Sequence, residues 1–407
     1  MKPVQVVGLG LDPKDLSPRL RGIIDEARVL AGGRRLLDFF PGHPGRRLVL
    51  AGGLEDWLGQ VEQEAGEGSV VVLASGDPGF FGIARRLVER LGRERVEIHP
   101  NLSCLQVAFA RLGLAWDQAA VLSLHGRGLD SLAGALRGRD LVAVLTDPQN
   151  HPGAMARLLL ERGQAEHWRM WVLEDLGGRE ERVRALEPAQ AVDQEFYPLN
   201  LVVFQRRVPA PALCLGAEDE SYQHQAGLIT KAEVRAVALA KLALGPGLTL
   251  WDLGAGCGSV GLEACLLMPG GRVLAVEQDE QRVEQIKANR RRCQAAELEV
   301  IQGRLPGALA GLARPDRVFV GGGGDQLAAI IEQSLQRLGP GGVLVAAVVR
   351  LESLEAARAA LVRAGLEPEL VQVQVSRGRS LGGGVYLKAL NPVWLVRGIK
   401  GGKGGEA

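Results

Sequence analysis

The residues best suited to chemistry in this sequence form a glycine-rich segment flanked by two acids. Gly254, Gly256 and Gly258 alternate with small residues, and Asp252 stands two positions before the first of them. Glycines let backbone N–H groups approach a ligand closely, and a helix that begins there offers free N–H donors. Glu277 follows roughly 20 residues later, where a carboxylate can accept hydrogen bonds from both hydroxyls of an adenosine ribose. The pattern predicts a nucleotide-binding turn.

A strand, a turn and a helix must hold these side chains in place. The apolar run at 250–253 is typical of a buried parallel strand, and a helix is expected from residue 260. A second strand, at 272–276, ends directly before Glu277. A dinucleotide fold would carry a third glycine where this chain has Ser259. A nucleotide-dependent oxidoreductase is therefore the weaker alternative, and stabilisation by NAD(H) would test it.

The turn resembles motif I of the class I S-adenosylmethionine-dependent methyltransferases. The segments GLITKAEVRA, WDLGAGCGSVGLEA and DRVFVGGGG extend the resemblance, over about residues 222–393, to a small methyltransferase of cobalamin synthesis. It implies a Rossmann-like domain with a seven-stranded sheet, for which the last strands are expected at 369–375 and 384–390. The implied cofactor contacts, with Asp252 toward the methionine end and Leu305 over the adenine, are Thr230, Asp252, Gly254, Ala255, Gly256, Cys257, Gly258, Glu277 and Leu305.

The helix before this turn has its own start signal. Thr230 followed by Glu233 forms a capping-box pattern, in which Thr230 is the N-cap and Glu233 occupies the third helical position.

Polar and glycine-rich clusters also follow several predicted strands in the first half of the chain. Strands at 4–8, 69–74 and 119–124 lead into the segments GLGLDP, SGDPGFFG and HGR. Ligands bind at the carboxyl ends of strands in open α/β sheets, so these clusters predict a second site. The guanidinium of Arg127 can bind a substrate carboxylate, and an equally good alternative is that Arg127 is a solvated surface residue. From residue types alone, Asp77 with Pro78 and Gly79 is better explained as a structural turn.

These segments, together with PNLSCLQVAFARLG and TDPQNHP, resemble the tetrapyrrole methylase family over about residues 3–207. The nearest subgroup methylates C5 of a corrin precursor in cobalamin synthesis. The resemblance implies a fold of two α/β subdomains, and cofactor contacts at Ser75, Gly76, Asp77, Phe80, Ser103 and Cys104. Leu11 stands where many members have proline, which weakens the transfer at this position.

The two resemblances together imply a fused S-adenosylmethionine-dependent C-methyltransferase with one cofactor per domain. They assign C5 methylation of a precorrin to the first domain, and C15 methylation with decarboxylation of the C12 acetate to the second. A cobalt-containing macrocycle is an alternative substrate. Prolines and an acidic run mark a linker, so the expected divisions are 1–207, a linker at 208–221, 222–395 and a disordered tail at 396–407.

The substrate contacts are expected where basic groups can meet the carboxylates of the tetrapyrrole and where glycines leave room for its flat ring. The candidates are Gly10, His125, Arg127, Lys231, Gly322, Gly323 and Arg379. Positioning of a nucleophilic ring carbon against the sulfonium methyl supplies most of the rate, so the sequence identifies no catalytic side chain.

Composition narrows the possible partners. The net charge of +1 provides no general attraction to nucleic acid or to an anionic membrane, which disfavours an RNA methyltransferase. Five cysteines without a CxxC pair, and histidines without close pairing, predict a cytoplasmic protein with reduced thiols and no metal site. No apolar run reaches the ~20 residues that span a bilayer. Both resembled families self-associate, so a dimer or tetramer is expected. A non-enzymatic binding or channelling role for one half remains open.

Overall fold

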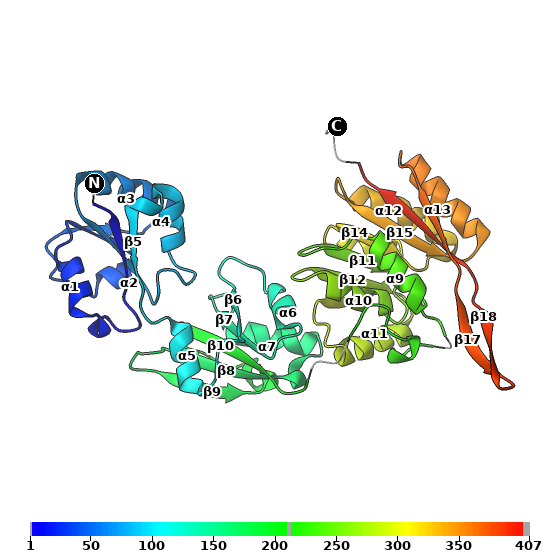
Figure 1. Ribbon diagram of the computed structural model, residues 1–407, viewed down its shortest axis with the longest axis horizontal. Coiled ribbons are helices and arrows are strands. Elements are labelled where there is room, and N and C mark those ends of the chain that lie inside the picture. Colours follow the sequence, from blue (N-terminus) through cyan, green and yellow to red (C-terminus); the bar gives the residue numbers. More distant parts are fainter. Residues whose placement is uncertain (1, 210–212, 226, 402–407) are drawn as a thin grey trace.

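The computed structural model describes residues 2–209, 213–225 and 227–401, and it shows a mixed α/β chain. Three open sheets, each with parallel strands, follow one another along the long axis of the molecule (Figure 1). The expected α/β class is therefore confirmed. A fourth, two-stranded sheet projects from the C-terminal part of the chain.

The first sheet is entirely parallel and has the order β3-β2-β4-β1-β5. Its elements are β1 (Val4–Gly8), α1 (Pro18–Asp25), β2 (Val29–Gly32), α2 (Arg34–Leu37), β3 (Arg46–Val49), α3 (Leu54–Glu67), β4 (Val70–Ala74), α4 (Ala84–Leu91) and β5 (Val96–His99). Alternate residues of β1 face opposite cores, because Val6 packs with α3 and α4 while Val7 packs with α1 and α2. Helices therefore cover both faces, as a parallel sheet requires.

The second sheet has the order β6-β7-β10-β8-β9, in which only β6 and β7 run parallel. Its elements are α5 (Cys104–Leu112), β6 (Ala120–Ser123), α6 (Ser131–Leu136), β7 (Leu141–Leu145), α7 (Pro152–Glu161), β8 (Trp168–Glu174), β9 (Arg182–Leu186), α8 (Pro188–Ala191) and β10 (Asn200–Arg206). α6 and α7 cover one face, and α5 packs through Leu105 and Phe109 on the other. The start of α5 is therefore held between the first two sheets.

The third sheet has the order β13-β12-β11-β14-β15-β19-β16, with β19 antiparallel to both of its neighbours. Its elements are α9 (Ala232–Lys241), β11 (Thr249–Leu253), α10 (Ser259–Leu267), β12 (Arg272–Glu277), α11 (Glu280–Arg292), β13 (Leu298–Gln302), β14 (Arg317–Val320), α12 (Leu327–Arg337), β15 (Val343–Val348), α13 (Leu351–Arg363), β16 (Glu369–Val373) and β19 (Val393–Ile399). α9, α10 and α11 pack with Leu250 on one face, and α12 and α13 pack with Trp251 on the other.

The expected C-terminal strands were partly wrong. β18 (Gly384–Ala389) does not join the large sheet but pairs with β17 (Ser376–Leu381) in a hairpin that projects from it (Figure 1). β19 takes the expected place, so the tail expected from residue 396 does not begin there. Every residue of β18 is exposed, whereas Leu395 and Val396 of β19 are buried, and burial decides which run is held in the sheet. Residues 402–407 of the expected tail lie outside the described residues.

The prediction of a capping box at the start of α9 was also wrong. The helix begins at Ala232, Lys231 is the N-cap residue, and its side chain makes no capping hydrogen bond. The first helical N–H, that of Ala232, donates instead to Asp219 Oδ1 at 3.1 Å. Glu233 pairs with Arg377 of the hairpin at 2.7 Å. Tertiary partners have therefore replaced the local cap.

The second and third units meet through polar side chains. Arg137 makes a two-point ion pair with Glu297, whose side chain is only 2% exposed. Arg162 pairs with Glu299 at 2.9 Å. Gln164 Nε2, which belongs to a buried side chain, donates to the carbonyl oxygen of Arg290 at 3.3 Å. These contacts fix the second sheet against the third, in addition to the covalent link.

Replacing Arg137 by glutamine is expected to weaken this contact by about 2 kcal/mol, or roughly 30-fold, because the buried carboxylate of Glu297 loses its cation. The measurement uses the full chain with a protease site inserted after residue 209, and it compares co-elution of the halves after cleavage. Arg139→Gln is the control, since the Arg139 side chain is exposed. Equal co-elution of the Arg137→Gln halves and the unsubstituted halves would contradict the interface.

Candidate functional site

A cavity of about 470 Å³ lies between the first two sheets. Its walls come from the segments that follow β4 and β6, from the start of α5, from the carboxyl ends of β7 and β8, and from the start of β10. The strand-end clusters of the first half therefore meet in one place, as expected. Seven of the residues predicted for the first half line this cavity: Ser75, Gly76, Asp77, Phe80, Ser103, Cys104 and His125.

Backbone contacts fix the loop after β4. The N–H of Gly76 donates to the carbonyl oxygen of Gly10 at 3.0 Å, and the reverse bond measures 3.3 Å. Asp77 Oδ1 accepts from the N–H of Gly79 at 2.8 Å, so the structural role expected from residue types alone is present. Ser103 caps α5 in a reciprocal pair with Gln106. Gly10 thus shapes the cavity without lining it.

Two of the expected substrate contacts of the first half differ in position. His125 is exposed and lines the cavity, whereas the exposed side chain of Arg127 does not. The carbonyl oxygen of Arg127 accepts a hydrogen bond from Asn150 at 3.1 Å, which closes the turn after β6. This backbone role agrees with the alternative of a solvated surface arginine.

The first cavity is mainly apolar. Phe80, Leu145, Leu173 and Leu201 contribute side chains, and no described lining residue is a lysine or arginine. Burial raises the pKa of the Cys104 thiol, so the sulfur stays protonated and is a poor nucleophile. The arrangement can hold a large, partly apolar ligand against backbone loops.

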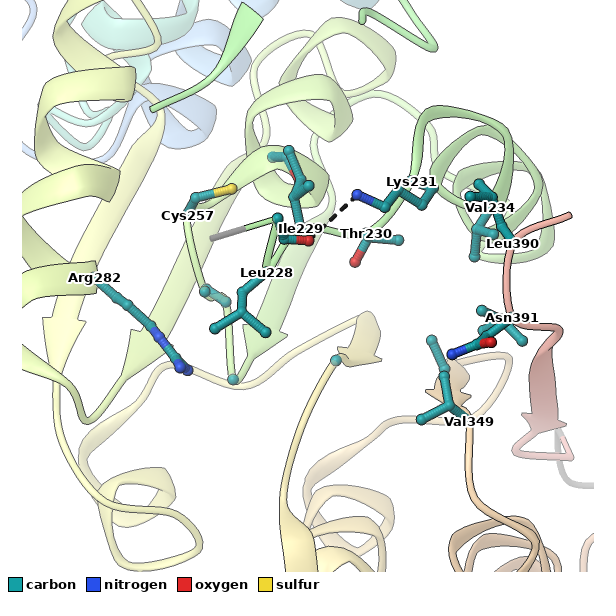
Figure 2. A pocket seen from close by; sticks show the side chains of 18 of the residues that line it. Leu228, Ile229, Thr230, Lys231, Val234, Cys257, Arg282, Val349, Leu390 and Asn391 are labelled. Carbon is teal, nitrogen blue, oxygen red and sulfur yellow. Dashed lines mark hydrogen bonds between the residues drawn. The ribbon is translucent and has the colours of Figure 1, made fainter. Parts of the chain in front are cut away.

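A second cavity, of about 660 Å³, lies at the carboxyl ends of β11, β14 and β15 (Figure 2). Its volume lies within the range typical of small-molecule sites. The other walls are residues 227–231, before α9, and residues 389–393, between the hairpin and β19. The predicted residues that line this cavity are Thr230, Lys231, Gly254, Ala255, Gly256 and Cys257.

The glycine-rich turn has a backbone that other residues adopt poorly. Gly254 and Gly256 have φ values of +70° and +59°. A Cβ atom on Gly254 would lie 3.0 Å from the N atom of Gly322, so packing requires this glycine. A Cβ atom on Gly256 would meet no atom within 4 Å. Gly256 therefore presents bare backbone to open space, which fits a ligand that lies directly on the turn.

Glu277 holds this turn in place. Its Oε2 accepts from the N–H of Gly256 at 2.9 Å, and its Oε1 accepts from Gln278 and Asp279 at 2.9 and 3.1 Å. The side chain is 5% exposed and lies next to the turn. A carboxylate has about four acceptor positions, so the three backbone bonds leave capacity for a ligand hydroxyl.

Asp252 lies behind the turn and does not line the cavity. It is 1% exposed, its Oδ2 accepts from the N–H of Gly261 at 3.0 Å, and its Oδ1 is buried with no partner among the described residues. Burial raises the pKa of this carboxyl to about 7, and the charge of Glu277 acts in the same direction. The residue anchors the start of α10 and keeps one acceptor free.

This pKa shift predicts a pH-dependent stability. The folded-state pKa of about 7 exceeds the reference value of 3.8, so the folded protein binds more protons between about pH 4 and pH 7. The contribution of Asp252 to stability therefore falls as pH rises through this window. In urea unfolding, Asp252→Asn should gain stability relative to the unsubstituted chain from pH 4 to pH 7. Parallel pH profiles of the two proteins would contradict the shift.

Of the predicted residues, Asp252, Gly258 and Glu277 lie at the turn without lining the second cavity, and four others lie outside it. Leu305 packs against the apolar core beneath α12 and α13. Gly322 abuts Gly254 and Gly323 abuts Leu327, while their neighbour Gly321 lines the cavity. Arg379 is exposed on the hairpin and borders a separate groove. Of the glycines at 321–324, Gly321 therefore borders the cavity, whereas the two predicted ones do not.

The sequence analysis missed several residues that line this cavity, among them Arg282, Val349 and Asn391. Arg282 extends from α11, Val349 follows β15, and Asn391 lies after the hairpin (Figure 2). Arg282 had a local signal, because it is the third residue after Asp279, the N-cap of α11, and so belongs to the first turn beyond Glu277. Asn391 had none, since its position depends on how the hairpin leaves the sheet.

Two general properties bear on the class of site. No helix in the described part of the chain is long and apolar enough to cross a membrane. Among residues 2–209, 213–225 and 227–401, no group of three or more histidine, cysteine, aspartate or glutamate side chains is placed to hold a metal ion.

Comparisons with known proteins connect these cavities to a class of enzyme. Residues 3–190 match the family of tetrapyrrole (corrin/porphyrin) methylases, and residues 220–399 match the precorrin methyltransferase domain. A Sinorhizobium protein named precorrin-6Y C(5,15)-methyltransferase (decarboxylating) is 34% identical over 401 residues, which cover 95% of this chain and 94% of that protein. The chain belongs to this family of decarboxylating methyltransferases.

Two shorter relatives come from Salmonella typhimurium. A cobalt-precorrin-7 C(5)-methyltransferase is 37% identical and covers 49% of this chain and 96% of its own length. A cobalt-precorrin-6B C(15)-methyltransferase (decarboxylating) is 38% identical and covers 41% of this chain and 87% of its own length. In that organism, the C(5) and C(15) names thus belong to separate proteins.

Proposed function

We propose that this chain uses S-adenosylmethionine to methylate precorrin-6Y at C5 and C15 and to release the C12 acetate carboxyl as carbon dioxide, giving precorrin-8. One observation carries the proposal: two separate strand-end cavities in one chain gather residues that two different methyltransferase resemblances imply. The similarity over nearly the full length to a protein with this name supports the same conclusion.

The residues present fit one methyl donor in each cavity. In the second, the backbone of Gly256 faces open space and the adjacent Glu277 keeps acceptor capacity for a ribose, which suits an adenosine. We assign this unit to the class I Rossmann-like fold, supported by its seven-stranded sheet, in which β11 lies between β12 and β14. In the first cavity, the loop at Ser75 and the start of α5 supply polar backbone beside an apolar wall.

When bound, the donor supplies an electrophilic methyl group on a sulfonium. The ring carbon that receives the methyl group is itself the nucleophile, so the task of the chain is alignment and exclusion of water. Burial raises the pKa of the Cys104 and Cys257 thiols, which keeps both from competing for the methyl group. No side chain is needed as a base in the methyl transfer itself.

We assign C5 methylation to the unit of residues 1–207, and C15 methylation with decarboxylation to residues 222–395, joined by a linker at 208–221. The two family matches, over residues 3–190 and 220–399, support two units, and the two Salmonella relatives carry the C(5) and C(15) names separately. Both reactions therefore occur in one chain without being merged into one cavity.

We further infer that the enzyme works in the cytoplasm as a dimer or tetramer, on a tetrapyrrole and without nucleic acid. The exposed apolar side chains of the hairpin, Leu381, Val385 and Leu387, support self-association, because such clusters are typical of protein interfaces. The near-zero net charge supports the absence of nucleic acid as a partner.

The test incubates the full chain with S-adenosylmethionine and reduced precorrin-6 and measures the product mass. The proposal expects a gain of two methyl groups and a loss of one carbon dioxide. An unchanged tetrapyrrole mass would overturn it.

A cobalt-containing macrocycle is the second candidate substrate, favoured by the names of the shorter relatives. Competition between the metal-free and the cobalt-containing tetrapyrrole in the same assay distinguishes the two. The natural substrate is the one with the higher kcat/KM.

A further inference from the structure

The second cavity carries an excess of positive charge. Its charged lining residues are Lys231 and Arg282, and no described lining residue is an aspartate or glutamate. The first cavity has the opposite character, since Asp77 lines it without a lysine or arginine. The two cavities therefore differ in charge although both fit the same donor.

Arg282 is the cation without a counterion. Its Nε is buried with no hydrogen-bond partner, and within the described chain its guanidinium makes no ion pair. Its backbone N–H donates to Asp279 Oδ1 at 2.9 Å. Figure 2 shows the side chain extending from α11 toward the open space that Leu228 also faces.

The neighbouring charged groups do not neutralise Arg282. Lys231 is engaged elsewhere, because its Nζ donates to the carbonyl oxygen of Gly227 at 3.3 Å and lies 3.5 Å from Asp219 Oδ2. Asp252 and Glu277 are buried, and their carboxylate oxygens accept hydrogen bonds from the backbone N–H groups of the glycine-rich turn and of α10. A partly buried guanidinium without a counterion is unfavourable, so the site gains stability from an anionic ligand.

We propose that Arg282 binds a peripheral carboxylate of the tetrapyrrole and thereby orients the ring for the second methylation and the decarboxylation. This inference rests on the proposed function. A substrate that loses carbon dioxide carries at least one carboxylate, and guanidinium binds carboxylates through two parallel hydrogen bonds. The donor has one carboxylate, but its sulfonium and ammonium outweigh that charge, so the additional cation suits the substrate better than the donor.

The experiment replaces Arg282 by glutamine in the full chain and measures tetrapyrrole binding by equilibrium dialysis. S-adenosylhomocysteine is present to prevent turnover, and the probe is reduced precorrin-6. We expect binding at one of two sites to weaken about tenfold or more, while the affinity for S-adenosylmethionine is unchanged. In turnover, the KM for the second methylation should rise more than kcat falls, and C5 methylation should continue.

Two further variants separate a binding role from a structural one. Arg282→Lys keeps the charge without the two-point geometry and should recover part of the affinity. Arg292→Gln removes an exposed charge from the same helix, and it should change neither the affinity for the tetrapyrrole nor the affinity for S-adenosylmethionine.

Two outcomes overturn the proposal. One is unchanged tetrapyrrole binding in Arg282→Gln. The other is weaker binding of S-adenosylmethionine with unchanged tetrapyrrole binding, which would assign Arg282 to the methionine carboxylate of the donor. Because binding is measured without turnover, an Arg282-dependent tetrapyrrole site in a chain that methylates nothing would support this inference while contradicting the proposed function.

Discussion

Replacing Glu277 by alanine will abolish C15 methylation while C5 methylation persists. The carboxylate accepts from the N–H groups of Gly256, Gln278 and Asp279, and it is the acid expected to hold the donor ribose. Its loss frees the glycine turn and removes the ribose contact together. Hydrogen bonds to a charged group contribute about 1.5–3 kcal/mol each, so C15 methylation should fall by at least about a hundredfold.

Product mass spectrometry checks this prediction within one protein, since the C5 reaction that we propose for the first cavity serves as the internal control. A singly methylated tetrapyrrole should accumulate. Glu280→Ala removes an exposed acid three residues further along and should leave both methylations intact. Intact double methylation by Glu277→Ala would refute the assignment of the second cavity to C15.

Replacing Arg235 by methionine should destabilise the C-terminal unit by about 3–5 kcal/mol, because it leaves a buried carboxylate without its cation. Arg235 and Glu263 are both 0% exposed and pair at 2.6 Å. Glu263 also accepts from Gly216, Ala217 and Tyr222 at 2.8, 3.1 and 3.0 Å. The network therefore ties the end of the linker to the core of the third unit.

The same network supports the second cavity. The guanidinium of Arg235 donates to the carbonyl oxygen of Thr230, which lines the cavity wall before α9. Weaker binding of S-adenosylmethionine should therefore accompany the loss of stability. Urea unfolding and equilibrium dialysis measure the two effects.

The matched control for Arg235 is Arg363→Met, which breaks the surface pair with Glu332. Those side chains are 57% and 41% exposed, so the free energy of unfolding should change by no more than about 1 kcal/mol. Equal stability of Arg235→Met and the unsubstituted chain would show that the buried pair is dispensable.

Local patterns predicted the parts of the site that local geometry determines. The turn at 254–258 needs alternating glycines between a strand and a helix, and the sequence shows this pattern directly. The prediction of a capping box failed because the actual partners are distant in sequence. Asp219 accepts a hydrogen bond at the start of α9, and Arg377, 144 residues away, binds Glu233. A local signal cannot report a partner of that kind.

The prediction of the C-terminal strands failed for a related reason. The sequences of β18 and β19 each contain β-branched and apolar residues that favour a strand. Only the packing of Leu395 and Val396 decides which of the two joins the sheet. The same long-range folding places Asn391 at the cavity and Arg379 away from it. The loop residues that border the cavity were therefore the least predictable part of the site.

The most direct test of the whole account is the number of donor molecules that one chain binds. Equilibrium dialysis of the intact protein with S-adenosylmethionine should saturate at two per chain, and Glu277→Ala should reduce this to one. Saturation of the unsubstituted protein at one per chain would contradict the claim that both cavities hold a methyl donor.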